Sequence, residues 1–167
     1  MPRLEFIKTD ILQHRDELLA LNIEYLTWVF DGIERFFGVS LEVPAADYVP
    51  TVIDQICADP SGIFYLLKLD GALAGMGGWR LLRPGVAEIK RLYVRPAYRG
   101  RKLGELILER LLADTATCPR ICLDSAPFMR TAHQLYANYG FLDCAAYSET
   151  EVPAEFHAQW RFMLREK

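Results

Sequence analysis

Cysteine and histidine are scarce in this sequence of 167 residues, which holds four cysteines and three histidines. The cysteines, at positions 57, 118, 122 and 144, form no Cys-x-x-Cys pair, and no histidine is spaced to complete a zinc site. We therefore expect neither a disulfide scaffold nor a metal centre. The thiols are expected to behave as small hydrophobic side chains.

Long apolar runs and an excess of charge of one sign are also absent. No apolar run approaches the ~18 residues of a membrane-spanning helix, and charged side chains between Lys8 and Glu17 interrupt the apolar order typical of a signal peptide. We therefore expect a cytoplasmic protein. The formal net charge of −3 gives no general attraction to nucleic acid or to an anionic membrane, so any bound anion must be held locally.

The composition that remains is that of a globular protein, with 51% hydrophobic and 25% charged residues. This length suits one domain with one core. No repeat, linker or low-complexity tract divides the chain, so the sequence predicts a single domain over residues 1–167.

The N-terminal part predicts one edge strand followed by helices. Residues 4–8 form a short apolar alternation, Asp10 is placed as a helix N-cap, and apolar residues recur at helical spacing from Ile11 to about Phe30. Glycine and proline interrupt residues 31–50, which predicts a loop or short helices there, before a second helix over 51–58.

The central part predicts a meander of three antiparallel strands over residues 63–69, 72–82 and 86–94, with Asp70-Gly71 as the first turn. The consecutive polar residues Lys90 and Arg91 break the alternation of the third strand. We expect a β-bulge at this point.

From residue 86 onward, strands and helices alternate. The pattern predicts a helix after Gly100, a strand over 120–124, a helix opened by Pro127 and ended by Gly140, and strands over about 141–147 and 158–165. The predicted fold class is therefore α/β, with a mixed, mostly antiparallel central sheet flanked by helices.

The segment from Val94 to Gly104 lies between a predicted strand and a predicted helix, and it is basic and contains glycine. The start of a helix offers unpaired N–H groups and the positive end of the helix dipole, and glycines let a phosphate approach the backbone. A pyrophosphate seat is one interpretation of this segment. The alternative is a surface helix whose basic first turn binds no ligand.

Two motifs resemble those of the GNAT (GCN5-related N-acetyltransferase) superfamily. Arg99-Gly100-Arg101-Lys102-Leu103-Gly104 is similar to the signature Arg or Gln, two residues, Gly, one residue, Gly or Ala. Leu135-Tyr136-Ala137-Asn138-Tyr139-Gly140-Phe141 is similar to Leu-Tyr, three residues ending in Gly, then Phe. The chain departs from the family at Lys102, which replaces the middle glycine, and at Met129, where relatives often carry an asparagine.

The resemblance implies acetyl-CoA as co-substrate, bound where the sheet splays open beside the third strand of the meander. The pantetheine arm would follow residues 92–94, the pyrophosphate would rest on the amides of residues 99–104, and an N–H near Leu92 would stabilise an oxyanion. The cofactor-binding residues implied in this way are Leu92, Tyr93, Val94, Arg99, Gly100, Arg101, Lys102, Leu103, Gly104 and Asn138.

Acetyl transfer to an amine needs a base for the amine and benefits from an acid for the departing thiolate. Glu88 is the candidate base, acting through a water molecule; the alternative is an ion pair between Glu88 and Lys90 on a solvated face. Tyr136 is the candidate acid, because the family often places a tyrosine here. The alternative is a core tyrosine with a satisfied hydroxyl.

Other conspicuous residues carry weaker hypotheses. Trp79 either walls an acceptor pocket or belongs to the core, and His133 is expected at the surface or behind the site. In the late loop, Glu149, Glu151, Glu155 and His157 either surround a cationic amine or are simply solvated.

The sequence thus predicts an N-acetyltransferase that moves acetyl from acetyl-CoA directly to a primary amine of a small molecule. The first helices and the last loop are expected to bind the acceptor. A non-catalytic acyl-CoA sensor is one alternative, and a module that binds another nucleotide or phosphate is a second. Neither nucleic acid nor membrane is an expected partner, and a homodimer is compatible with the sequence.

Overall fold

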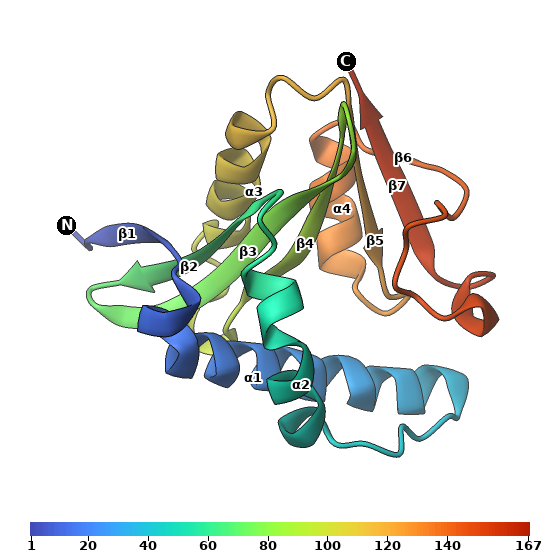
Figure 1. The fold of residues 1–167 in the computed structure, drawn as a ribbon, viewed down its shortest axis with the longest axis horizontal. Coiled ribbons are helices and arrows are strands. Elements are labelled where there is room, and N and C mark those ends of the chain that lie inside the picture. Colours follow the sequence, from blue (N-terminus) through green and yellow to red (C-terminus); the bar gives the residue numbers. More distant parts are fainter.

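A seven-stranded sheet with helices on both faces forms the fold of residues 1–167 in this computed structural model (Figure 1). The strand order is β1-β2-β3-β4-β5-β7-β6, and only the β4–β5 pair is parallel. This confirms the predicted mixed, mostly antiparallel α/β sheet. The elements are β1 (Leu4–Lys8), α1 (Ile11–Phe37), α2 (Ala45–Cys57), β2 (Ile63–Leu69), β3 (Ala72–Arg83), β4 (Val86–Val94), η1 (Pro96–Tyr98), α3 (Leu103–Asp114), β5 (Arg120–Ser125), α4 (Arg130–Asn138), β6 (Leu142–Asp143), η2 (Ala154–Phe156) and β7 (Arg161–Glu166).

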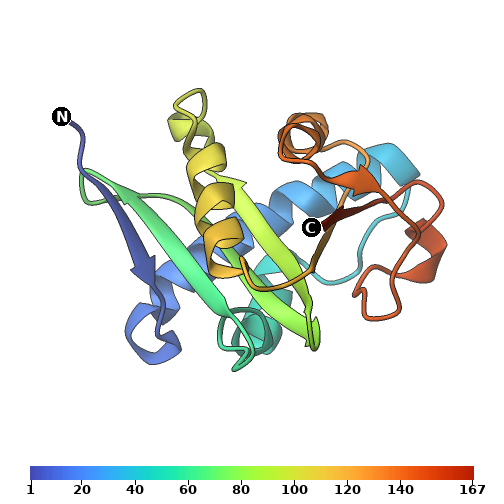
Figure 2. The ribbon, with the colours of Figure 1, turned by 90° about the horizontal axis from the view of Figure 1, so that it is seen from above.

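The two faces of the sheet carry separate apolar clusters. Helices α1 and α2 pack on one face, and α3 and α4 pack on the other (Figure 2). None of the helices combines the length and the apolar character that crossing a lipid bilayer requires.

Helix α1 begins as predicted and ends later than predicted. The carboxylate of Asp10 accepts hydrogen bonds from the backbone N–H groups of Leu12 and Gln13, at 2.9 and 3.1 Å. The helix continues through Gly32 to Phe37, so the predicted break after residue 30 is wrong. A Cβ at Gly32 would stand 2.3 Å from the ring of Phe128, so close packing requires glycine at this position inside the helix.

Helix α2 is also longer than the sequence indicated. It begins at Ala45 rather than at residue 51, and it includes Pro50. The ring costs the helix one hydrogen bond. Val49, Ile53 and Ile56 are buried on one side of the helix, and this packing outweighs the effect of the proline.

The predicted bulge is present in β4. Between the pairs Met76–Tyr93 and Gly78–Lys90, β4 contains one residue more than β3, and Arg91 adopts a left-handed φ of 52°. The bulge twists the strand at the place where its side chains meet the candidate site.

Beside the bulge the sheet opens, as expected. Strands β4 and β5 pair only from Val86–Arg120 to Glu88–Cys122, although β4 continues to Val94. The backbone of β4 after Glu88 therefore has unpaired groups on its β5 side.

The C-terminal region differs from expectation in its boundaries. Helix α4 begins at Arg130 because Pro127 lies in the preceding turn, and β6 is only two residues long, Leu142–Asp143, instead of 141–147. Residues 144–160 form a loop that returns to β7 at Arg161. All four cysteines are free thiols.

Candidate active site

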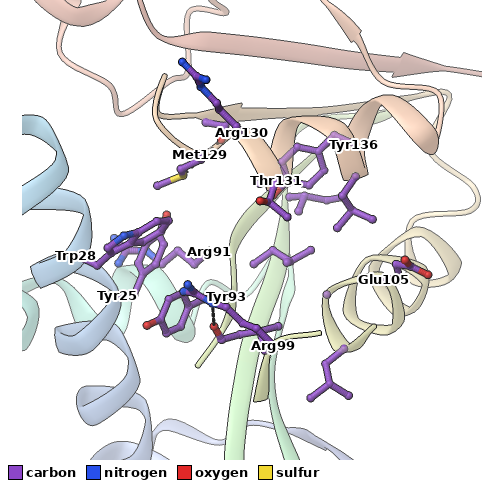
Figure 3. Close-up of a pocket in the computed structure, with 18 of the residues that line it drawn as sticks. Tyr25, Trp28, Arg91, Tyr93, Arg99, Glu105, Met129, Arg130, Thr131 and Tyr136 are labelled. Carbon is purple, nitrogen blue, oxygen red and sulfur yellow. Dashed lines mark hydrogen bonds between the residues drawn. The ribbon is translucent and has the colours of Figure 1, made fainter. Parts of the chain in front are cut away.

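Two cavities meet where β4 and β5 separate. The first cavity, of about 470 Å³, is bounded by the end of β4, the residues that lead into α3, and the start of α4 (Figure 3). The second cavity, of about 550 Å³, is bounded by α1, the segment from Leu41 to Tyr48, β4 and the loop around Val152. The residues that line both cavities are Tyr25, Ile89, Arg91 and Asp124.

The first cavity collects nearly all of the residues predicted to bind a cofactor. Arg101 and Asn138 are the exceptions, since both are exposed and neither lines the cavity. The Arg101 guanidinium lies over the ring of Tyr98 instead, 5.9 Å from its centroid. The predicted cofactor-binding residues that do line the cavity are Leu92, Tyr93, Val94, Arg99, Gly100, Lys102, Leu103 and Gly104.

The start of α3 has the geometry of an anion site. Its first intrahelical hydrogen bond runs from the N–H of Leu106 to the carbonyl of Lys102, so the amides of the first turn have no partner within the helix. Gly100 and Lys102 adopt φ values of 75° and 58°. Lys102 therefore holds a left-handed conformation that glycine adopts without steric cost, which gives a physical reason for the glycine of the resembled signature.

Arg99 does not extend over the start of α3. Its Nε donates a hydrogen bond of 3.1 Å to the carbonyl of Val94, and its guanidinium lies 5.7 Å from the ring centroids of Trp28 and Tyr93 (Figure 3). The positive charge therefore lies on the wall of the first cavity, beside Trp28 and Tyr93. Trp28, on α1, is a wall residue that the sequence motifs do not indicate.

Glu88 is a buried carboxylate on the wall of the second cavity, and its side chain is 3% exposed. Nε of Arg80 donates to Oε1 at 3.0 Å, and the hydroxyl of Tyr147 donates to Oε2 at 2.7 Å. Burial raises the pKa of Glu88, and these two partners oppose the rise. The predicted alternative partner was wrong, because Lys90 pairs with Glu151 at 3.0 Å.

Asp124, at the end of β5, is a site residue that the sequence analysis missed. The indole of Trp160 donates to its Oδ1 at 3.0 Å, and the Tyr147 hydroxyl lies 3.3 Å from its Oδ2. Burial raises the pKa of this carboxyl. The available indication was the position of an acidic residue at the carboxyl end of a strand beside the splayed edge, where α/β sheets often bind ligands.

Tyr136 is buried on α4 and lines the first cavity (Figure 3). Its ring packs edge-on against Phe141 at 5.9 Å. No protein group forms a hydrogen bond with its hydroxyl, and burial raises its pKa. The hydroxyl is therefore protonated at neutral pH and retains its capacity to donate.

Trp79 and His133 belong to the interior rather than to the cavities. The Trp79 indole donates to Asp114 at 3.2 Å, and its ring packs against the core, as the structural interpretation predicted. His133 is buried, not at the surface, and its Nε2 has no hydrogen-bond partner. Burial, followed by the nearby charge of Arg161, lowers the pKa of His133.

The acidic late loop does not surround a cation site. Glu149 forms an ion pair with Arg83, and Glu151 forms ion pairs with Arg80 and Lys90. Glu155 is exposed, and Nε2 of His157 lies 2.8 Å from the carbonyl of Val152. Only Glu151 of this group lines the second cavity, and its charge is already neutralised.

Comparison with known proteins identifies the fold and the family. Residues 29–141 match the model of the acetyltransferase (GNAT) family. The chain belongs to the GNAT family. This confirms the predicted resemblance to the GNAT superfamily. The structure resembles the paiA N-acetyltransferase of Thermoplasma acidophilum, solved in complex with coenzyme A, with a TM-score of 0.68, 15% identity and 99% of each chain covered.

Other GNAT proteins are similar over the whole fold or over shorter segments. A GNAT acetyltransferase of Staphylococcus aureus gives a TM-score of 0.68 at 19% identity, with 98% of this chain and 99% of that chain covered. An uncharacterized N-acetyltransferase of Schizosaccharomyces pombe is 35% identical over 42% of this chain and 44% of its own length. An IAA acetyltransferase of Azospirillum brasilense is 30% identical over 53% of this chain and 60% of its own length. The matched segments thus span less than two thirds of these curated relatives.

Proposed function

We propose that this protein transfers the acetyl group of acetyl-CoA directly to the primary amine of a small molecule within a ternary complex. The observation that carries the proposal is the meeting of two cavities at the opening between β4 and β5, with Asp124 on the wall of both. One cavity contains the GNAT signature, and the other is bounded by the helices and loop expected to bind an acceptor.

The residues of the first cavity suit acetyl-CoA. The unpaired amides at the start of α3 and the ammonium of Lys102 supply donors and positive charge for a pyrophosphate. The unpaired backbone of β4 after Glu88 supplies the donors and acceptors that an amide-containing pantetheine arm requires. Bound acetyl-CoA supplies the activated acetyl group.

Direct transfer is supported by the state of the thiols. Cys57 and Cys122 are buried, and burial raises the pKa of each to about 12, so both stay protonated and weakly nucleophilic at neutral pH. Neither lines a cavity. A covalent acyl-cysteine is therefore not part of the proposal.

Three groups of the chain act on the reacting atoms. Glu88 receives the proton of the amine through a water molecule, and Tyr147 and Arg80 fix the carboxylate for this role. A backbone N–H near Leu92, at the bulge, stabilises the negative charge that develops on the carbonyl oxygen. Tyr136 gives its proton to the departing thiolate. The net reaction converts one ammonium and one thioester into an amide, a thiol and a proton.

The test is thiol release from acetyl-CoA with a panel of amines. Glu88→Gln and Tyr136→Phe are each expected to lower the rate by about 10²- to 10⁴-fold. Tyr139→Phe is the matched control, because its hydroxyl bonds Glu109 on the exposed side of the molecule, away from both cavities. Unchanged turnover in Glu88→Gln or Tyr136→Phe contradicts the assigned roles.

The binding step is tested separately by thermal shift. A ligand that binds only the folded chain stabilises it by ~2.7 kcal/mol at a hundred times its dissociation constant. We expect a shift with acetyl-CoA and none with ATP or NAD. A non-catalytic acyl-CoA sensor is the second candidate, because the chain departs from the family motifs at Lys102 and Met129. A sensor predicts the same thermal shift but no thiol release with any amine.

A further inference from the structure

Two charged side chains on the shared wall of the cavities lack partners of opposite charge. None of the ion pairs of the structure includes Asp124 or Arg91. Of the other charged side chains that line the second cavity, Glu88 pairs with Arg80, Lys90 pairs with Glu151, and Glu42 is exposed to solvent. A partly buried charge without a counter-charge is costly, so this pair indicates a ligand that supplies both signs.

Asp124 is fixed and still has capacity to accept. Its Oδ1 accepts a hydrogen bond from the Trp160 indole at 3.0 Å, and its Oδ2 lies 3.3 Å from the Tyr147 hydroxyl, whose proton is donated to Glu88. A carboxylate has about four lone-pair sites, so an ammonium group can still bind to it. Its position on both cavities is where the amine must lie to reach the thioester.

Arg91 is held in place by α1 without being neutralised. Its Nη1 donates to Oδ1 of the fully buried Asn22 at 3.3 Å, and its guanidinium lies 5.7 Å from the ring centroid of Tyr25. These are neutral partners, and they occupy only part of a group that has five N–H donors. The remaining donors suit a carboxylate, which guanidinium binds in a bidentate manner.

The rest of the second cavity is apolar and rich in rings. At its outer side, Leu41, Val43 and Tyr48 line the cavity while remaining 37%, 51% and 40% exposed, so an apolar ligand group would remove them from water. The aromatic residues of the wall are Tyr25, Phe30, Tyr48, Phe156 and Trp160.

We propose that the acceptor is an amino acid with an apolar, ring-bearing side chain, whose ammonium binds Asp124 and whose carboxylate binds Arg91. The inference rests on the proposed function, because it names the substrate class of the same site. An apolar amine without a carboxylate would leave Arg91 without a partner. A polar amine would leave the apolar wall of the second cavity without a partner.

The test compares L-phenylalanine with two matched compounds, L-phenylalaninamide and phenethylamine, and with L-serine. Thiol release from acetyl-CoA should give L-phenylalanine at least a tenfold higher kcat/KM than each of the others. Titration calorimetry with the CoA-saturated protein should give the same order of affinity. Equal or better use of phenylalaninamide or phenethylamine overturns the inference and leaves the proposed function standing, whereas no thiol release with any amine overturns both.

Variants separate the two contacts. Arg91→Gln should reduce the preference for L-phenylalanine over L-phenylalaninamide at least tenfold, and Arg91→Lys should restore part of it. Asp124→Asn should weaken binding of L-phenylalanine and of phenethylamine alike. Arg35→Gln, on the exposed end of α1, is the control. Because Arg91 lies in the bulge, melting temperature is measured for each variant, and an unchanged preference in a folded Arg91→Gln protein contradicts the carboxylate contact.

Discussion

The hydroxyl of Tyr147 donates a hydrogen bond of 2.7 Å to Oε2 of Glu88, and the hydroxyl oxygen of Tyr147 also lies 3.3 Å from Oδ2 of Asp124. A phenol has one proton to donate, so two carboxylates share a single donor. Burial raises the pKa of both carboxyls, and the bond from Tyr147 opposes the rise. Tyr147 therefore helps to keep both the proposed base and the proposed ammonium ligand deprotonated.

Replacing Tyr147 by phenylalanine should shift the pH dependence of the reaction. Without the hydroxyl, the pKa of Glu88 and that of Asp124 rise further, because a hydrogen bond to the charged form is lost. A base acts only when deprotonated, so the acidic limb of the kcat/KM profile should move to higher pH. The measurement is thiol release between pH 5 and pH 9, and the expected shift of the acidic limb is about one pH unit. Tyr139→Phe should leave the acidic limb at the same pH. An unchanged acidic limb in Tyr147→Phe contradicts the effect of the Tyr147 hydroxyl on the pKa of Glu88.

His133 should make the fold less stable in acid. Burial lowers the pKa of His133 in the folded chain below its unfolded value of about 6.5. The unfolded chain therefore binds this proton more readily, so the free energy of unfolding falls as the pH drops below about 6.5 and continues to fall towards the folded pKa. His133→Leu removes both the titration and the unpaired Nε2. Urea unfolding at pH 5.5 and 8 should show that the free energy of unfolding falls less at the lower pH in the variant than in the original protein. An equal fall in both proteins contradicts the role of His133.

Local patterns predicted most of the sheet. The apolar run of β2, the alternation in β4 and the Asp70-Gly71 turn depend on near neighbours, and the structure has both residues of this turn at positive φ. The bulge at Arg91 was likewise visible, because two consecutive polar residues break a period of two.

The errors came from contacts between distant segments. The ring of Phe128 leaves no room for a side chain at Gly32, so this glycine marks close packing rather than a helix end, and Pro50 is tolerated because its helix buries five apolar residues. The Asp124–Tyr147–Glu88 cluster joins residues up to 59 positions apart, so no spacing in the sequence indicates it. The side-chain direction of Arg99 was equally inaccessible, because it depends on Trp28 from α1.

Lys102 should be less tolerant of branched substitutions than its neighbour Arg101. A φ of 58° costs an L-residue about 1–2 kcal/mol, and a β-branched side chain is the least compatible with it. Lys102→Val should therefore lower the melting temperature by several degrees, whereas Lys102→Gly should change it little, since relief of strain offsets the greater freedom of the unfolded chain. Arg101→Val, on an exposed residue without positive φ, is the control. Equal melting temperatures for the two valine variants contradict the strain.

The basic turn formed by residues 99–104 should contribute to acetyl-CoA binding through individual side chains rather than through its total charge. Arg99 lies on the wall of the first cavity beside the rings of Trp28 and Tyr93, and Arg101 points away over Tyr98. A charge-assisted hydrogen bond contributes about 1.5–3 kcal/mol, so Arg99→Ala should weaken CoA binding by about ten- to a hundredfold.

Arg101→Ala removes the same charge from the same turn and is therefore the matched control. We expect it to change the dissociation constant of CoA by less than about threefold at 150 mM salt, because exposed charges outside the cavity are screened. Titration calorimetry of both variants provides the comparison. Equal losses would mean that residues 99–104 attract CoA by their overall charge, and the position of Arg99 on the cavity wall would then have no bearing on binding.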